Sequence, residues 1–399
     1  MAGLAVLIAA CSSGGAVDGA ERERAAVTAP STTIEDYPDA QTRALRRLAT
    51  APRPVANSAI PPRHLDQERF PEALVDRYLI VSGGVQPDAI PPIDEPRFEN
   101  VADVDWLTDG EAVLALEVEG AARAYPVQVM IWHEIVNDTV GGVPVTVSYC
   151  PLCNSATAFE RRVADGTVLD FGVSGGLYQS ALVMYDRQSE SLWTHFDGRA
   201  VIGDRIGEAL TLVPVATVSW ADFAAAHPDG RVLARVDPSR PYGRNPYGSH
   251  DSRTDPLPGF FRGEVDPRLA PMERVVGVQI EGAEVAIPLT RLQAERLVIV
   301  DIGDRRAAVA WVPGAVSALD TDRVDEGAEI GSTGVFWIEG DVVSGADGEA
   351  LAIPATGARW DILGRALHDS SAAALEPVPH VDTFWFAWSS YHPATDVSS

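Results

Sequence analysis

The chain has 399 residues, an apolar fraction of 46% and a formal net charge of −26 at pH 7. That length exceeds what one hydrophobic core usually supports, so two domains of roughly 150 residues are expected. The sequence contains no lysine, which excludes Schiff-base chemistry on a lysine. Its strong negative charge argues against nucleic acid or an anionic lipid surface as a partner, because phosphate contacts require a basic surface.

The amino terminus predicts a lipoprotein of the cell envelope. Residues 2–10 are apolar and precede Cys11, as in a bacterial lipobox, where the cysteine thiol accepts the lipid. The apolar run is too short to span a bilayer. Residues 1–11 are therefore expected to be a signal peptide with its lipobox, and residues 12–69 a disordered tether rich in Ala, Ser, Thr, Pro and Arg. The protein would be anchored by lipid on the extracytoplasmic face of the membrane.

The globular part is expected to begin near residue 70 and to consist mainly of strands. A short amphipathic helix is expected over residues 126–136, with His133 and Glu134 at its end. The strand before Cys150 is expected to end there, because Pro151 cannot continue a hydrogen-bonded ladder. Strands are predicted at residues 112–118, 122–125, 143–149, 157–161, 168–173 and 181–185.

The second part of the chain repeats the pattern of the first at a constant offset in the numbering. The correspondences are residues 119–126 with 281–288, Gly141 with Gly303, Tyr149 with Trp311 and Pro151 with Pro313. We therefore predict a β-rich α+β fold made of two tandem copies of one domain, residues 70–236 and 272–396, with a linker over 237–271. Cys150 and Cys153 have no counterpart in the second copy, which is expected to be degenerate.

Cys150 and Cys153 are the residues at which chemistry is expected. A Cys-x-x-Cys pair brings two sulfurs within reach of one metal ion or of each other. Disulfide oxidoreductases place this motif at the start of a helix, whereas here it follows a predicted strand, which favours a metal site. The expected ligands are both cysteines with His133, which Glu295 replaces in the second copy, and Met184 as a weak fourth ligand. Thiolate and imidazole ligands in this compartment favour copper slightly over zinc.

Two other functions stay open for the cysteine pair. The pair can cycle between dithiol and disulfide, with His133 or Glu134 relaying protons. Alternatively it is a permanent disulfide in a non-catalytic binding or scaffold protein. An oxidoreductase is the first catalytic expectation, with Glu134 and Ser174 as candidate catalytic residues, whereas the substrate and any small-molecule or protein partner are not indicated. Residues 172–176 are expected to form a β-bulge or turn, and no phosphate-binding loop or dinucleotide fingerprint is present.

Four motifs, taken together, resemble a known family. They are HEIVND at 133–138, YCPLCNSA at 149–156, FGVSG at 171–175 and VMYDRQ at 183–188. In this order they are similar to a family of uncharacterised prokaryotic extracytoplasmic proteins that is catalogued as a domain of unknown function. The resemblance covers roughly residues 88–393. It implies a signal sequence or lipid anchor and supports a site at Cys150, Cys153 and His133, but it implies no activity.

Overall fold

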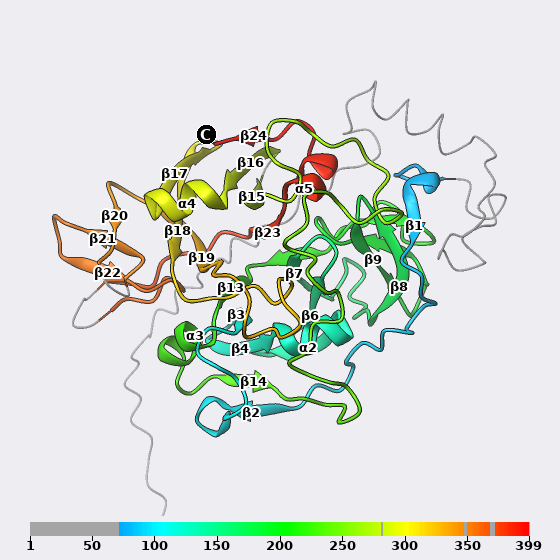
Figure 1. Ribbon diagram of the computed structural model, residues 1–399, viewed down its shortest axis with the longest axis horizontal. Helices are drawn as coiled ribbons and strands as arrows, with labels where there is room; N and C mark the ends of the chain where they lie inside the picture. Colours follow the sequence, from blue (N-terminus) through cyan, green and yellow to red (C-terminus); the bar gives the residue numbers. More distant parts are fainter. Residues whose placement is uncertain (1–71, 281, 347–348, 368–371, 399) are drawn as a thin grey trace, which may run out of the picture.

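The structure is a computed structural model that describes residues 72–280, 282–346, 349–367 and 372–398 (Figure 1). These residues form six sheets and four short α-helices, which confirms the prediction of a β-rich α+β fold. The predicted lipobox at Cys11 and the tether lie outside the described residues. In the described ranges, the helices are all too short or too polar to span a membrane.

The first half of the described chain contains three sheets. The first consists of β13 (Ala216–Ser219), β3 (Ala112–Val118), β4 (Ala121–Pro126), β14 (Arg231–Leu233) and β2 (Phe98–Asn100). The second consists of β12 (Thr211–Val213), β7 (Ser155–Glu160), β6 (Val143–Cys150) and β5 (Ile135–Val140). The third consists of β1 (Ile80–Ser82), β8 (Phe171–Tyr178), β9 (Ala181–Asp186), β10 (Leu192–Thr194) and β11 (Ala200–Ile202). Two helices complete this half, α2 (Val127–His133) and α3 (Trp220–Ala226).

The second half also contains three sheets. The first consists of β23 (Val381–Phe384), β15 (Arg274–Ile280), β16 (Ala283–Pro288) and β24 (Asp396–Val397). The second consists of β17 (Leu297–Ile302), β18 (Arg305–Val312) and β19 (Ser332–Ile338). The third consists of β20 (Val343–Ser344), β21 (Leu351–Ile353) and β22 (Ala358–Trp360). Its helices are α4 (Leu289–Glu295) and α5 (Trp385–Tyr391).

Elements of the first half recur in the second in the same order. Strands β3, β4, β5 and β6 and helix α2 correspond to β15, β16, β17, β18 and α4, with one constant offset between their first residues and equal length in each pair. Strand β13 is antiparallel to β3, as β23 is to β15. Strand β14 is parallel to β4, as β24 is to β16. The pairing pattern therefore recurs along with the order of the elements.

Local sequence explains the strands that carry the cysteines. Strand β6 is rich in β-branched residues, which favour strands, and seven of its eight residues are buried. Gly141 and Gly142 form the turn that joins it to β5, with φ values of 57° and 85° that suit a two-residue hairpin. The strand predicted at 168–173 is only partly correct, because β8 begins at Phe171 and continues through an irregularity to Tyr178.

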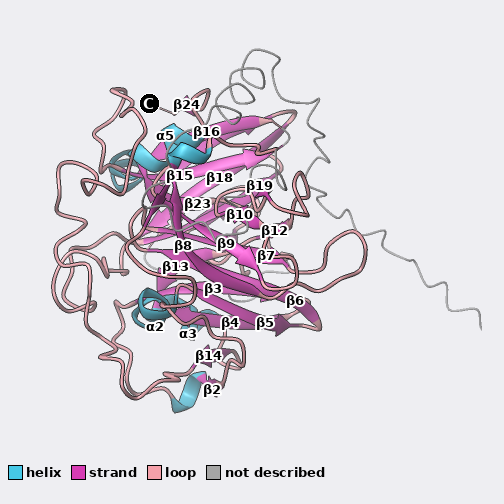
Figure 2. Ribbon diagram, turned by 90° about the vertical axis from the view of Figure 1, so that its right-hand side faces the viewer, coloured by secondary structure: helices cyan, strands magenta, loops and turns pink. Residues whose placement is uncertain are grey.

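Buried side chains of the two halves pack in common hydrophobic clusters. One cluster combines residues of β6 and β7 with residues of β15, β16, β23 and α5. Figure 2 shows the sheets stacked above one another, from β16 at the top to β2 at the bottom, with β23 and β7 near the middle. Strand β23 contacts β7 directly. The cysteine-bearing strands therefore lie where the two halves meet.

Candidate functional site

Cys150 and Cys153 lie in a tight turn between β6 and β7. Cys150 is the last residue of β6 and pairs with Ser155, the first residue of β7. The Asn154 amide donates to the Pro151 carbonyl at 3.2 Å, and Asn154 adopts a φ of 50°, which asparagine tolerates better than most residues. The prediction that the motif follows a strand is confirmed. The motif occupies a strand–turn–strand unit, without a helix after it.

The two thiols are free, buried and adjacent. Cys150 is 1% exposed and Cys153 is 0% exposed, and no disulfide joins them. The Cys150 thiol donates to the Ser180 carbonyl at 3.6 Å, and Cys153 Sγ lies 2.9 Å from Ser155 Oγ. Burial raises the pKa of Cys153 well above its ordinary value, and the neighbouring Cys150 thiol raises it further. Cys153 is therefore protonated at neutral pH.

A buried histidine, His195, is connected to Cys153 through Ser155. Ser155 Oγ lies 2.7 Å from His195 Nε2, while His195 Nδ1 lies 3.1 Å from Ser148 Oγ and 3.3 Å from Thr157 Oγ1. Burial lowers the pKa of His195 to about 3, so the imidazole is neutral. A neutral imidazole has one N–H donor and one acceptor nitrogen. The row of hydroxyl and imidazole groups can therefore pass a proton to or from Cys153.

His195 was not among the residues predicted for the site, although the sequence holds a signal for it. Trp193 corresponds to Trp360, and the same offset places His195 opposite Ile362. His195 is therefore a histidine of the first half without a counterpart in the second half. That was the criterion that favoured His133, and it does not separate the two histidines.

His133 ends α2, and both of its ring nitrogens are engaged. Nδ1 lies 2.8 Å from the Pro91 carbonyl oxygen and Nε2 lies 2.7 Å from the Tyr242 hydroxyl. Because a carbonyl can only accept, Nδ1 carries the hydrogen and Nε2 accepts from Tyr242. A metal ion could reach His133 only if one of these hydrogen bonds were broken. Tyr242 belongs to the 237–271 segment, which thus packs against the first half.

Glu134 is a buried carboxyl group beside the end of β6. It is 7% exposed, adopts a φ of 58°, and its carbonyl accepts from the Tyr149 amide at 2.8 Å. Burial raises the pKa of Glu134 to about 7, and the Tyr247 hydroxyl, which donates to it at 3.2 Å, lowers that value only in part. The pKa of Tyr247 is raised well above its ordinary value by burial, then by Glu134 and by Cys150. Tyr247 therefore lies close to both the carboxyl group and the Cys150 thiol.

Ser174 and Met184 lie in the sheet that contains β8 and β9. Among the described residues, neither one forms a hydrogen bond with Cys150 or Cys153. The Ser174 hydroxyl donates to the Val183 carbonyl and accepts from the Gly176 amide at 2.9 Å. The strand register shifts at this point, which confirms the predicted bulge. Met184 is fully buried in the shared core. Within the described part of the chain, no three His, Cys, Asp or Glu side chains gather as metal ligands would, and the four-residue copper or zinc site stays a prediction.

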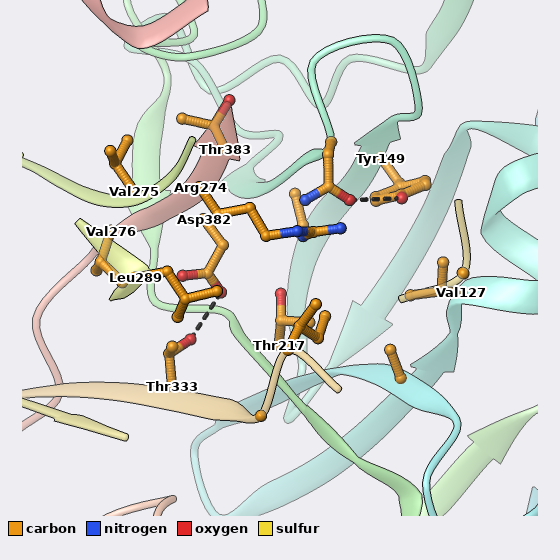
Figure 3. Close-up of a pocket in the computed structure, with 16 residues that line it drawn as sticks. Val127, Tyr149, Thr217, Arg274, Val275, Val276, Leu289, Thr333, Asp382 and Thr383 are labelled. Atoms are coloured by element: carbon orange, nitrogen blue, oxygen red, sulfur yellow. Dashed lines mark hydrogen bonds between the residues drawn. The ribbon is translucent and has the colours of Figure 1, made fainter. Parts of the chain in front are cut away.

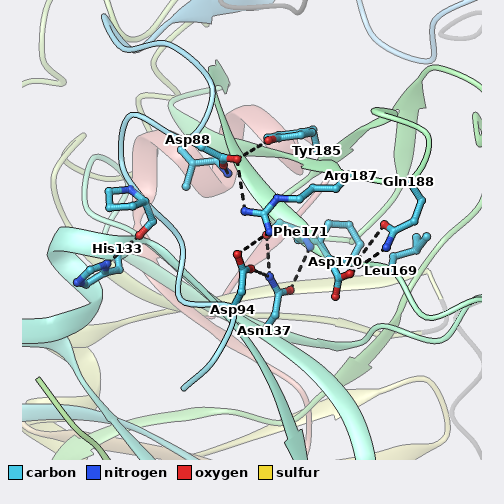
Figure 4. A network of polar contacts seen from close by, with 12 residues as sticks. Asp88, Asp94, His133, Asn137, Leu169, Asp170, Phe171, Tyr185, Arg187 and Gln188 are labelled. Carbon is cyan, nitrogen blue, oxygen red and sulfur yellow. Dashed lines mark hydrogen bonds and ion pairs between the residues drawn. The ribbon is translucent and has the colours of Figure 1, made fainter. Parts of the chain in front are cut away.

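Residues of the other sequence motifs form a network of ion pairs and hydrogen bonds around Arg187 (Figure 4). Arg187 forms ion pairs with Asp94 at 2.6 Å and Asp88 at 3.3 Å. The Asn137 amide donates to Asp94 at 2.8 Å and to the Phe171 carbonyl at 2.8 Å, and it accepts from the Phe171 amide at 3.1 Å. These contacts join the end of β9, the start of β8 and strand β5 to the segment before β2. The motifs therefore position the sheets around the cysteine turn.

The second half and the 237–271 segment hold the turn from outside. The Cys153 carbonyl accepts from the Thr383 hydroxyl at 2.8 Å and from the Phe384 amide at 3.0 Å. His250 Nε2 donates to the Leu152 carbonyl at 2.9 Å. The turn is thus fixed by contacts from two separate parts of the chain.

The motifs that build this site match one protein family. The family model described as "Protein of unknown function (DUF3179)" matches residues 87–395. The chain belongs to this family. The resemblance inferred from the four motifs is thereby confirmed, and the matched range includes both halves of the fold. No curated protein and no solved structure matches the chain, so the function of this DUF3179 member has to be argued from its own site.

Proposed function

We propose that the chain is an extracytoplasmic thiol–disulfide redox protein that uses the Cys150 and Cys153 pair. The observation that carries the proposal is the pair of adjacent free thiols with Cys153 linked through Ser155 to His195. Two residues between the cysteines make a loop short enough for a disulfide to close. A lipid anchor at Cys11 would keep the protein in an oxidising compartment, where such pairs cycle or persist as disulfides.

Burial favours this reading over a bound Cu(I) ion. Metal ligation requires both thiols to lose their protons, and two thiolates around a monovalent ion leave a net negative charge. The dithiol and the disulfide are both neutral. Burial already raises the pKa of Cys153, and an uncompensated buried charge costs several kcal/mol. The surroundings of the sulfurs therefore suit an exchange between two neutral states.

The reaction partner is a disulfide of a small molecule or protein. One cysteine attacks a substrate sulfur as its thiolate, the substrate disulfide breaks, and a mixed disulfide forms while one substrate thiol leaves. The second cysteine then attacks the mixed disulfide, which releases the second substrate thiol and closes the Cys150–Cys153 bond. The protein loses two electrons and two protons, and the substrate gains both.

Groups that can accept or relay a proton lie on both sides of the Cys150 and Cys153 pair. Glu134, with its pKa raised by burial to about 7, lies with Tyr247 on the Cys150 side. On the Cys153 side, His195 is reached through Ser155. A group that titrates near the working pH is well suited to accept and return a proton. We assign Glu134 the acceptance of one thiol proton. We assign Ser155 and the neutral His195 the relay of the other proton, because an imidazole with a pKa of about 3 passes a proton on and does not hold it.

The proposal includes a tandem duplication in which only the first copy retained the chemistry. The recurrence of five elements at one constant offset supports it. In the second copy, the residues opposite the cysteines carry no thiol. Its assigned role is to hold the cysteine turn through Thr383 and Phe384.

Alkylation and mass spectrometry test the redox function. The protein with Cys11→Ser is equilibrated in glutathione buffers of graded potential, the free thiols are alkylated, and the peptide that contains both cysteines is weighed. We expect a reversible transition between a doubly alkylated peptide and an unalkylated, disulfide-bonded one, and Cys150→Ser should abolish it. Thiols that remain alkylatable at every potential, in protein that carries stoichiometric metal, would overturn the proposal.

Copper or zinc binding is the second candidate function. The strand–turn–strand position of the motif favours it, because no helix amino terminus follows Cys150 to stabilise a reactive thiolate. Both cysteines would bind the ion as thiolates, which suit Cu(I) and zinc. Metal analysis of the purified protein tests this candidate directly. If His133 is a third ligand, His133→Ala should weaken metal binding by about 10–100-fold or more while the fold persists.

A further inference from the structure

A pocket that is partly open to solvent lies between the two halves beside the cysteine turn (Figure 3). Tyr149 and Asn154 line it from the first half, and Arg274 and Asp382 line it from the second. The sulfurs themselves are not part of its lining. The pocket therefore adjoins the cysteine turn without containing the thiols.

Two hydrogen-bond donors of the pocket lining, one from each half, have no protein partner in the described ranges. Arg274 Nε and Nη2 bond Asp251 at 3.3 and 2.8 Å, and Nη2 also bonds Ser317, so Nη1 is without a partner among the described residues. Asn154 Oδ1 accepts from the Tyr149 hydroxyl at 3.0 Å, which leaves its Nδ2 unused. Figure 3 shows the Arg274 guanidinium extending toward Tyr149, whose hydroxyl bonds Asn154. A guanidinium and an amide nitrogen that line one pocket suit a carboxylate.

Strand β23, which pairs with the Arg274 strand β15, carries an acceptor that is incompletely satisfied. Asp382 Oδ2 accepts from the Thr333 hydroxyl at 2.7 Å. Asp382 Oδ1 is buried and has no hydrogen-bond partner in the described part of the chain. A buried acceptor without a donor costs about 1–3 kcal/mol, and more when it is charged. An ammonium group would supply both the missing donor and a compensating positive charge.

The balance of charge decides between kinds of ligand. Arg274 is already paired with Asp251, so Asp382 leaves the pocket with one negative charge in excess. A ligand with a carboxylate and no amine would be repelled by that excess negative charge. A plain amine would leave the Arg274 and Asn154 donors unused. A ligand with both groups satisfies all three residues.

We infer that this pocket binds a zwitterionic α-amino acid with an apolar side chain. The carboxylate contacts Arg274 and Asn154, and the ammonium group contacts Asp382. The apolar side chain lies against an aliphatic surface of the pocket, which consists of Val275, Val276, Leu289 and Ile330. The inference goes beyond the proposed thiol–disulfide function and does not depend on it.

Calorimetric titration of the full-length protein tests this binding site. The probes are L-leucine, 4-methylpentanoate, which lacks the amino group, and 3-methylbutylamine, which lacks the carboxylate. We expect leucine to bind at least about tenfold more tightly than either analogue, a difference of about 1.4 kcal/mol. Equal affinity for leucine and 4-methylpentanoate would refute the zwitterion, and no binding of leucine would refute the site.

Two variants locate the binding. Asp382→Asn keeps an acceptor for Thr333 and removes the charge, so the fold should persist and leucine affinity should fall about tenfold or more. Asp341→Asn, which changes a fully exposed carboxylate, is the matched control and should leave the affinity unchanged. Leucine binding that is unaffected by Asp382→Asn would overturn the assignment. The variant with serine at Cys150 and Cys153 should retain leucine binding, which separates this inference from the redox proposal.

Discussion

Replacing Glu134 with glutamine is expected to stabilise the protein at alkaline pH and to leave its stability unchanged at acid pH. Burial raises the pKa of Glu134 from 4.5 to about 7, and the hydrogen bond from Tyr247 offsets only part of that shift. The folded state therefore holds the proton more tightly than the unfolded state does. The stability contributed by this more tightly held Glu134 proton is complete below about pH 4.5 and is lost as the pH rises through about 7.

The size of the effect follows from the shift. A rise from 4.5 to about 7 corresponds to about 3 kcal/mol, because each pKa unit is worth about 1.4 kcal/mol. Glutamine resembles the protonated acid in shape and keeps an acceptor for the Tyr247 hydroxyl. Glu134→Gln should therefore exceed the wild type in free energy of unfolding by about 3 kcal/mol at alkaline pH. Near the unfolded pKa the two proteins should be equally stable.

Urea denaturation at about pH 4.5 and about pH 8 measures both values. The control is Glu295→Gln, because Glu295 is an exposed carboxylate at the end of α4 that pairs with Arg291. That control should show little change in stability at either pH. A Glu134→Gln protein that is no more stable than the wild type at alkaline pH would refute the reasoning. So would a stability difference that is the same at both pH values.

Three further substitutions test other parts of the site. Gly172→Ala should lower the free energy of unfolding by about 1–3 kcal/mol, because its Cβ would lie 2.5 Å from the Tyr185 ring; an unchanged urea midpoint would contradict this. Ser155→Ala should slow oxidation of the thiols by oxidised glutathione at least about tenfold, since it removes the link from Cys153 to His195; an unchanged alkylation time course argues against the relay. Burial lowers the pKa of His195 to about 3. The stability that the neutral His195 imidazole contributes is therefore complete above about pH 6.5 and is lost as the pH falls toward 3. His195→Asn should therefore lose less stability over that range in urea titrations, and an equal loss would contradict the burial of a neutral imidazole.

Local sequence was sufficient to predict the strands around the cysteine turn. The β-branched run of β6 is a local signal, and the strand formed where it was expected. Helix α2 ends at His133 rather than at residue 136, because Glu134 adopts a positive φ and β5 begins at Ile135. The end of α2 was expected to lie near the end of β6, and the hydrogen bond from the Tyr149 amide to Glu134 confirms that proximity.

The direction of the His133 side chain could not be predicted from local sequence. Its partners, Pro91 and Tyr242, are 42 and 109 residues away in the chain. His195 reaches the site for a comparable reason, since it follows β10 in a different sheet and lies 40 residues from Ser155. Sequence patterns report periodicity and turns, whereas these contacts depend on how separate sheets pack. The sequence analysis therefore located the cysteine turn and missed the histidine connected to it.

The contacts of the second half connect the thiol pair to the pocket between the halves. Thr383 lines that pocket, and its hydroxyl holds the Cys153 carbonyl at 2.8 Å. Asn154, which follows Cys153 directly, lines the pocket as well. Asn154 is one of the residues to which we assign the ligand carboxylate, so a shift of the turn on disulfide formation would change the ligand site. If the ligand binds one redox state more tightly, thermodynamic linkage requires it to favour that state by the same factor. The titrations with leucine, repeated on the reduced and the oxidised protein, measure that factor directly.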